Sequence, residues 1–298
     1  YMNHLNGFLI INKSKGFTSH DCVKRIKKLL NVKKVGHTGT LDPQVTGILP
    51  IALGNATRFI QYLPQEKTYL GIIKLGVTTD TDDIQGKVLA TKEWPIISIE
   101  KLDHYLNNFR GKFQQVPPKL SSIHIKGERA YKKFFNNEEF EIPAREVTIN
   151  QLEILNWDQN NGKIGLRISC SAGTYIRSLA RDLGQILDSE GCLYELSRIQ
   201  SSGFDNKTCI DFNNIDELQT NFEKYLIPID KALNHLPKYK LIKSEEILYW
   251  ETGRKINVNI ENIEPLKNPY NNFPIRVMNR TNNLLGIGLL NKDELSFI

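Results

Sequence analysis

Residues 36–43 read Gly-His-Thr-Gly-Thr-Leu-Asp-Pro, and the stretch continues through Gly-Ile-Leu-Pro at 47–50 to Gly-Asn-Ala-Thr-Arg at 54–58. Asp42 is its only acidic residue. The following proline biases Asp42 away from helical geometry, which predicts that this carboxylate lies on a loop. The glycines allow the backbone to turn sharply or to approach a ligand closely. Asp42 could simply cap a turn or could be a chemical centre, and the spacing alone leaves both interpretations open.

Positive charge is concentrated in the same part of the chain. Residues 1–60 hold nine lysines and arginines against two acidic residues, a balance of +7, so the rest carries about −1 of the total charge of +6. A local basic surface attracts a polyanion, most simply nucleic acid, through counterion release and electrostatic steering. The basic residues at 24–28 would equally suit an ordinary solvated helix face, so their charge alone does not establish nucleic-acid binding.

Length and composition indicate an ordinary folded protein. A chain of 298 residues with 40% hydrophobic and 24% charged residues can hold a catalytic domain and a small appended module. No apolar run approaches the ~20 residues needed to cross a bilayer, and no secretion signal is visible, so we expect no membrane association. The four cysteines form no Cys-x-x-Cys pair and are interpreted as free thiols, which predicts a cytoplasmic location.

Hydrophobic periodicity predicts alternating strands and helices. Strands are expected at 8–12, 69–75, 87–91, 147–157 and 164–170, and helices at 19–30, after Ser98, and at 175–187. Ser19 is expected to cap the first helix. Residues 117–145 show little periodicity, which indicates a functional or mobile loop. A boundary near Leu236–Pro237 and strands at 275–278 and 284–290 predict a small β-rich module at the C-terminal end.

Several common enzyme motifs are absent from the sequence. It contains no nucleophile elbow, no phosphate-binding loop and no dinucleotide fingerprint, so neither ATP nor a nicotinamide cofactor is expected. Asp80, Asp82 and Asp83 are not followed by a calcium-loop pattern, and we interpret them as solvated acids of a turn. The histidines are scattered without helical pairing, so no metal site is expected.

The motif at residues 36–58 resembles the signature of the TruB family, bacterial pseudouridine synthases that modify the uridine at position 55 in the T loop of tRNA. The resemblance extends to further motifs in the same order along the chain. They lie at residues 7–10, 16–19, 67–69, 115–118, 173–177 and 196–198. Ordered motifs over this length are far more specific than any one of them alone.

This resemblance implies the fold and the domains. The fold would be α/β (α+β), with a mixed, mainly antiparallel central sheet flanked by helices. Residues 1–236 would form the pseudouridine synthase catalytic domain, in which 117–145 would be an RNA-contacting loop. Residues 237–298 would form a PUA-like RNA-binding module. The partner would be the T stem-loop of tRNA, the chain would act as a monomer, and it would need no cofactor.

The resemblance also assigns roles to individual residues. Asp42 would be the catalytic carboxylate, and Arg177 would pair with it and hold it ionised. Tyr69 would stack on the target uracil and accept the proton from C5, directly or through water. Tyr175 and Leu196 would line the pocket.

His37 would help to hold the T loop after the uridine has left its stack. Without the resemblance, the residues leave two other functions open. One is a non-catalytic tRNA-binding or tRNA-folding protein, and the other is an N-glycosidase that cleaves the base without rejoining it.

Overall fold

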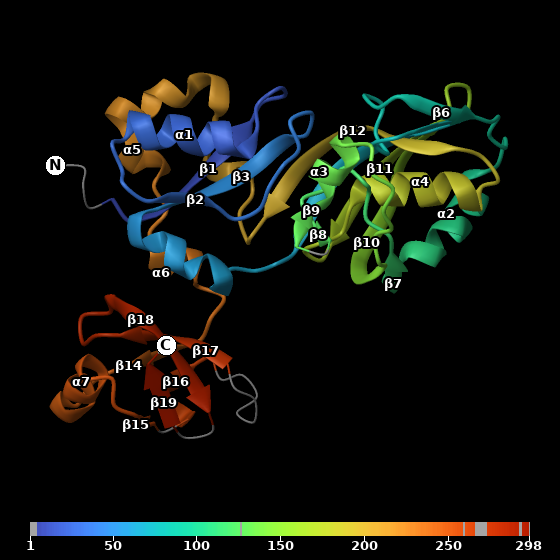
Figure 1. Ribbon diagram of the computed structural model, residues 1–298. Coiled ribbons are helices and arrows are strands. Elements are labelled where there is room, and N and C mark those ends of the chain that lie inside the picture. Colours follow the sequence, from blue (N-terminus) through green and yellow to red (C-terminus); the bar gives the residue numbers. More distant parts are fainter. Residues whose placement is uncertain (1–4, 126, 259, 266–272, 292–293, 298) are drawn as a thin grey trace.

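The computed structural model describes residues 5–125, 127–258, 260–265, 273–291 and 294–297. Two sheets organise this part of the chain (Figure 1). The larger has nine strands in the order β13-β1-β3-β12-β4-β11-β10-β7, with β2 paired to β3. Only its β1–β13 and β3–β12 pairs are parallel, which confirms the expected mixed, mainly antiparallel arrangement.

One half of the large sheet is built from β1 (Gly7–Lys13), β2 (Val35–His37), β3 (Thr46–Leu53) and β13 (Cys209–Asp211). Strand β1 is apolar on both faces because both are covered. Leu9 and Ile11 belong to one core cluster, and Phe8 and Ile10 to another. The strand expected at 8–12 is thus confirmed.

Helix α1 (Ser19–Leu29) begins at the residue that was expected to cap it. Thr18 is the N-cap, and it forms a capping box with Asp21 in which each side chain bonds the other residue's backbone N–H. The prediction that Ser19 caps the helix was therefore wrong. The Ser19 hydroxyl instead accepts a hydrogen bond from the backbone N–H of Leu41, at 2.9 Å.

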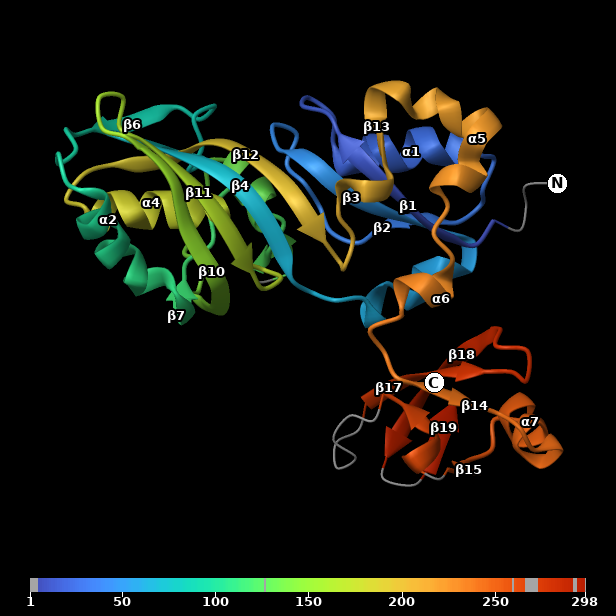
Figure 2. The ribbon, with the colours of Figure 1, turned by 180° about the vertical axis from the view of Figure 1, so that it is seen from behind.

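The other half of the sheet contains β4 (Lys67–Leu75), β7 (Gly111–Gln115), β10 (Arg145–Asp158), β11 (Lys163–Cys170) and β12 (Gly191–Ser201). Helices α2 (Ile99–Leu106) and α4 (Ile176–Ile186) pack on one face, and the view from behind shows β4, β10 and β11 in front of them (Figure 2). Helix α2 begins directly after Ser98, as expected, and Ser98 is its N-cap. The apolar side of α4 is buried, because Leu179 and Leu183 are inaccessible to solvent.

Strand β12 joins the two halves. Its Ser197 and Arg198 pair with Thr46 and Gly47 of β3, while most of the strand pairs with β4. Gly47 has φ +108°, and a Cβ there would lie 2.2 Å from the carbonyl oxygen of Arg198. The two halves therefore meet at a point where only glycine fits.

Smaller elements surround the sheet. A hairpin is formed by β5 (Val77–Thr79) and β6 (Val88–Thr91). Residues 117–145 contain β8 (His124–Ile125), β9 (Glu128–Arg129) and α3 (Ala130–Phe135), so the expectation of a segment with little structure was only partly right. Helices α5 (Leu218–Tyr225) and α6 (Ile229–Ala232) follow the large sheet, and 3₁₀ helices lie at Gly54–Tyr62, Asn107–Phe109, Asn206–Thr208, Phe212–Glu217 and Ile260–Asn262.

The smaller, six-stranded sheet uses only residues after 237. It comprises β14 (Lys238–Lys240), β15 (Ile256–Asn257), β16 (Ile263–Glu264), β17 (Phe273–Met278), β18 (Leu284–Asn291) and β19 (Glu294–Phe297), with α7 (Ser244–Glu251) beside it. Tyr239, Trp250 and Val277 belong to a core cluster of its own. The strands expected at 275–278 and 284–290 are confirmed.

The described residues contain no helix long and apolar enough to span a bilayer. All four cysteines are free, as the sequence predicts, and three of them are buried.

Candidate active site

A cavity of about 650 Å³ lies where the two halves of the large sheet meet. Its lining brings together five of the six predicted site residues, namely Asp42, Tyr69, Tyr175, Arg177 and Leu196. These residues come from the loop before β3, from β4, from the start of α4 and from β12. His37 is not part of the lining.

Asp42 lies on a loop, as predicted, and the loop is held on both sides of it. On one side, the backbone of Leu41 is hydrogen-bonded to the Ser19 hydroxyl. On the other side, the carbonyl of Pro43 accepts hydrogen bonds from the Gly16 N–H at 2.8 Å and from the Lys13 ammonium at 3.2 Å. The Lys13 side chain is inaccessible to solvent, and burial lowers its pKa. The position of Asp42 is thus set by its neighbours in the chain.

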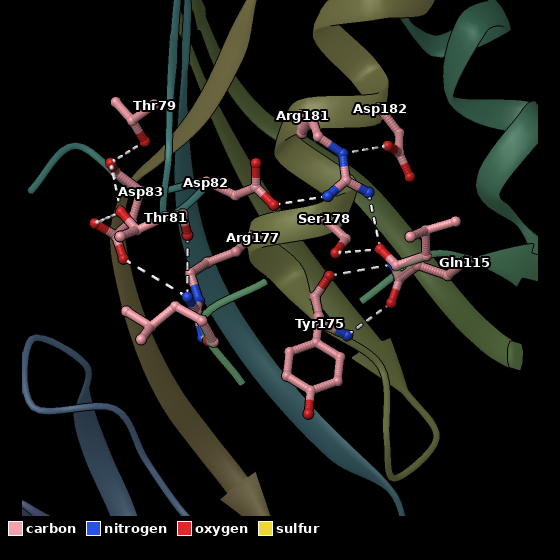
Figure 3. Close-up of polar contacts among 12 residues, drawn as sticks. Thr79, Thr81, Asp82, Asp83, Gln115, Tyr175, Arg177, Ser178, Arg181 and Asp182 are labelled. Carbon is pink, nitrogen blue, oxygen red and sulfur yellow. Dashed lines mark hydrogen bonds and ion pairs between the residues drawn. The ribbon is translucent and has the colours of Figure 1, made fainter. Parts of the chain in front are cut away.

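Arg177 contacts the carboxylate of Asp42. Its Nη2 lies 3.0 Å from Asp42 Oδ2, and its side chain is only 7% exposed whereas that of Asp42 is 48% exposed. The guanidinium also donates to the carbonyl of Thr81, at 3.0 Å (Figure 3). It donates as well to the carbonyl of Leu120, at 2.9 Å. Arg177 is therefore a fixed, buried cation, while Asp42 faces the cavity.

Tyr69 is buried in the wall of the cavity, with 7% of its surface exposed. Burial raises the pKa of its hydroxyl, and the nearby Arg198 guanidinium opposes the rise. The ring is therefore a protonated phenol at neutral pH. Leu196, on the neighbouring strand, is also buried and contributes an apolar surface.

Tyr175 is held through its backbone rather than through its ring. Its N–H donates to Gln115 Oε1 at 2.9 Å, and Gln115 Nε2 donates back to its carbonyl at 3.1 Å. Figure 3 shows these two bonds, with the tyrosine ring projecting away from them. The paired amide thus leaves the Tyr175 ring available to the cavity.

Comparison with known proteins places this geometry in a family. Residues 27–176 match the N-terminal domain of the TruB family of pseudouridylate synthases. The chain belongs to the TruB family. A relative from Prochlorococcus marinus strain MIT 9301, named tRNA pseudouridine synthase B, is 56% identical over 98% of this chain and 96% of its own length. Another with the same name, from Synechococcus sp. strain CC9311, is 46% identical over 96% of this chain and 94% of its own.

Solved structures agree with the family assignment. A structure described as a Cbf5-Nop10-Gar1 complex matches with a TM-score of 0.71 and 26% identity, over 96% of this chain and 79% of the other. An archaeal box H/ACA sRNP Nop10-Cbf5 complex matches with a TM-score of 0.67 and 27% identity, over 96% and 79%. The TruB chain has the pseudouridine synthase fold.

Two acids of the TruB chain were misjudged from the sequence. The turn at 80–86 is not a set of solvated acids, because Asp82 is buried and lies 2.6 Å from Arg181 Nη1 (Figure 3). Burial raises the pKa of Asp82, and Arg181 opposes this rise. Asp83 Oδ2 lies 4.0 Å from Arg177 Nη1. Arg177 and Arg181 are four residues apart on α4, so they share one face of the helix. This spacing in the sequence could have indicated that acidic residues lie opposite them.

Arg198 is a site residue to which sequence reasoning gave no role, although its motif was recognised. Its side chain is fully buried, and it donates to the carbonyls of Ile48 at 2.8 Å, Gly39 at 3.0 Å and Thr40 at 3.4 Å. It therefore ties β12 to β3 and to the loop that leads to Asp42. The sequence signal was an arginine inside an otherwise buried strand, a position where charged residues are rare unless paired.

His37 lies at the end of β2, outside the cavity lining. Its Nδ1 is buried and has no hydrogen-bond partner among the residues that the structure describes. Burial, together with the charge of Arg198, lowers the pKa of His37, so the imidazole is neutral near pH 7. Within the described chain, no group of three or more His, Cys, Asp or Glu residues is arranged to hold a metal ion.

Proposed function

We propose that this chain is a tRNA pseudouridine synthase that isomerises the uridine at position 55 of the T loop. The observation that carries the proposal is the half-exposed carboxylate of Asp42, paired with a buried arginine at the wall of a cavity large enough for a nucleotide. The names of the family relatives support tRNA as the substrate.

The reaction breaks the bond between N1 of uracil and C1′ of ribose, turns the base, and rejoins it through C5. It needs a carboxylate near the sugar and base, an enclosed pocket to retain the base, and a route for the C5 proton. In this proposal Asp42 is the catalytic carboxylate. Arg177 holds its side chain in place through the ion pair at 3.0 Å.

Tyr69 would stack on the uracil and take up the C5 proton. Because its raised pKa keeps the hydroxyl protonated, it would pass its own proton to water as it accepts the new one. Tyr175 and Leu196 would enclose the base. A uridine must leave its stack to reach these residues, at a cost of a few kcal/mol, and His37, next to the catalytic loop, would hold the T loop in the open form.

The remaining parts of the chain would bind the rest of the RNA. We assign residues 1–236 to the catalytic domain, with 117–145 as an RNA-contacting segment, and residues 237–298 to a PUA-like RNA-binding module. The separate core of the six-stranded sheet supports this division. The protein would act as a monomer in the cytoplasm, on tRNA alone and without a cofactor.

The decisive experiment measures tritium release from tRNA that carries 5-tritiated uridine. The wild type is expected to release tritium and to leave the mass of the RNA unchanged, and Asp42→Asn is expected to release none. Asp216→Asn is a matched control, because Asp216 also pairs with an arginine but on the exposed surface.

Free uracil among the products would show an N-glycosidase instead. Tight tRNA binding without any tritium release by the wild type would favour the non-catalytic tRNA-binding or tRNA-folding protein.

A further inference from the structure

Some of the lysine and arginine side chains around the cavity lie close to a carboxylate, and others do not. Arg177 lies near Asp42 and Asp83. Lys67 lines the cavity, and Arg198 lies behind it, but among the described residues neither has a carboxylate within 4.0 Å. Two neighbouring cations therefore stand without a counter-charge beside the reaction centre.

These two cations converge on one glycine. A Cβ added to Gly39 would lie 3.0 Å from Lys67 Nζ and 3.7 Å from Arg198 Nη1. Arg198 is anchored by main-chain carbonyls, whereas no hydrogen-bond acceptor of Lys67 is found in the described part of the chain. Both burial and the charge of Arg198 lower the pKa of Lys67.

Placing two like charges together away from water costs free energy unless something neutralises them. Carbonyl oxygens stabilise Arg198, but Lys67 has no such partner among the residues that the structure describes. Since Lys67 lines the cavity, the compensating negative charge can come from the substrate. Lys67 and Tyr69 are two residues apart on β4, so their side chains leave the same face of the strand about 6.6 Å apart.

We propose that Lys67 is a catalytic residue whose ammonium group stabilises the negative charge that develops on the uracil ring when the glycosidic bond breaks. This inference rests on the proposed pseudouridine synthase activity. The uracil ring is a better partner for Lys67 than a phosphate group, because Lys67 lies beside Tyr69, on which the ring would stack. A phosphate remains part of a continuous RNA chain and is better placed at an open surface.

The step is balanced without an external reagent. The electron pair of the N1–C1′ bond passes to the uracil ring, where it is shared between nitrogen and carbonyl oxygen, and C1′ is left with a positive charge until the new bond forms. Lys67 donates a hydrogen bond to that charge and keeps its proton. After the base turns, the ring supplies the pair for the C5–C1′ bond, the C5 proton leaves, and N1 takes up a proton.

Lys67→Met tests this role, and Lys74→Met is the matched control. Lys74 lies on the same strand but stacks over Trp94 and donates to the carbonyl of Asn161, away from the cavity lining. With saturating enzyme in single-turnover experiments, Lys67→Met is expected to lower the rate about 10²- to 10³-fold. Its affinity for tRNA should stay within about threefold of the wild type, and Lys74→Met should leave both unchanged.

The pH profile of Lys67→Arg supplies a second readout that a purely structural role would not move. The wild-type rate should fall with rising pH as Lys67 loses its proton. The arginine of the variant stays charged, so the pH at which the rate falls should be higher in Lys67→Arg. Arg198, Tyr69, Cys170 and His37 are the other charged or titratable groups near Lys67. Burial raises the pKa of Tyr69 above its ordinary 10 and raises that of Cys170 to about 11, whereas the pKa of Lys67 is lowered from its ordinary 10.5.

Three results would overturn the inference. These are an unchanged rate in Lys67→Met, a loss confined to tRNA affinity, which would indicate a phosphate contact, and a falling limb at the same pH in Lys67→Arg as in the wild type. If Lys67→Met does not fold, the Lys67→Arg profile still decides. An inactive wild type would instead refute the proposed function, so the two failures are distinguishable.

Discussion

The guanidinium of Arg177 holds the Asp42 carboxylate at 3.0 Å and also donates to carbonyl oxygens of two distant loops. The arginine is buried and the aspartate is half exposed, so the rigid partner of this pair is the arginine. The carboxylate is thereby oriented before any substrate arrives, which lowers the cost of bringing the reacting groups into position.

Arg177→Lys tests this orientation. A lysine keeps the charge but cannot reach the carboxylate and both carbonyls together, because it lacks the planar fork of donors. We expect the rate constant for tritium release to fall about 10²-fold or more, with little change in tRNA affinity. Arg25→Lys, in the exposed pair with Asp216, should behave as the wild type, and equal activity of Arg177→Lys and Arg25→Lys would contradict the prediction.

Arg198→Met should lower stability. The substitution leaves the buried carbonyl of Ile48 and the part-buried carbonyl of Gly39 without their donors, which is expected to cost roughly 3 kcal/mol or more of the free energy of unfolding. Urea denaturation followed by circular dichroism measures this. A loss below about 1 kcal/mol would mean that other groups or water satisfy these carbonyls.

Gly47→Ala tests the junction between β3 and β12. The new Cβ would meet the Arg198 backbone at 2.2 Å in a left-handed conformation, so we expect a loss above about 4 kcal/mol or failure to fold. Gly111→Ala is the control, because Gly111 has φ +80° but nothing within 4 Å of the added Cβ. It should cost only about 1–2 kcal/mol of backbone strain. Similar losses in the two variants would show that the close approach is relieved by movement of the strands.

His37 should make stability depend on pH. Burial lowers its pKa in the folded state below the ordinary 6.5, so the unfolded chain binds more protons between those two values. Stability from this source is complete above pH 6.5 and is lost as the pH falls toward the folded pKa. The stability advantage of the wild type over His37→Asn should therefore shrink below pH 6.5 in urea titrations. The same titrations of His104→Asn, a substitution at an exposed helix position, are the control measurement.

Local patterns in the sequence predicted most of the elements. The strand at 8–12, the helix after Ser98 and the strands at 275–278 and 284–290 follow from apolar periodicity and capping residues, which act between near neighbours. The loop position of Asp42 follows from Pro43. The burial of Asp82 was missed because its partner, Arg181, is distant in the sequence. The cap of the first helix was missed although the Thr18–Asp21 pair that forms it is local.

The candidate site divides in the same way. The sequence by itself determined that Asp42 is the lone carboxylate of its loop. It also determined the order of the family motifs along the chain. The resemblance already implied that Asp42 pairs with Arg177. Only the tertiary structure decided that Asp82 meets Arg181, and that Lys67 and Arg198 converge on Gly39 with no carboxylate of the described chain beside them. These contacts join residues far apart in the chain, and their geometry depends on how β12 pairs with β3 and β4 together, which no local pattern specifies.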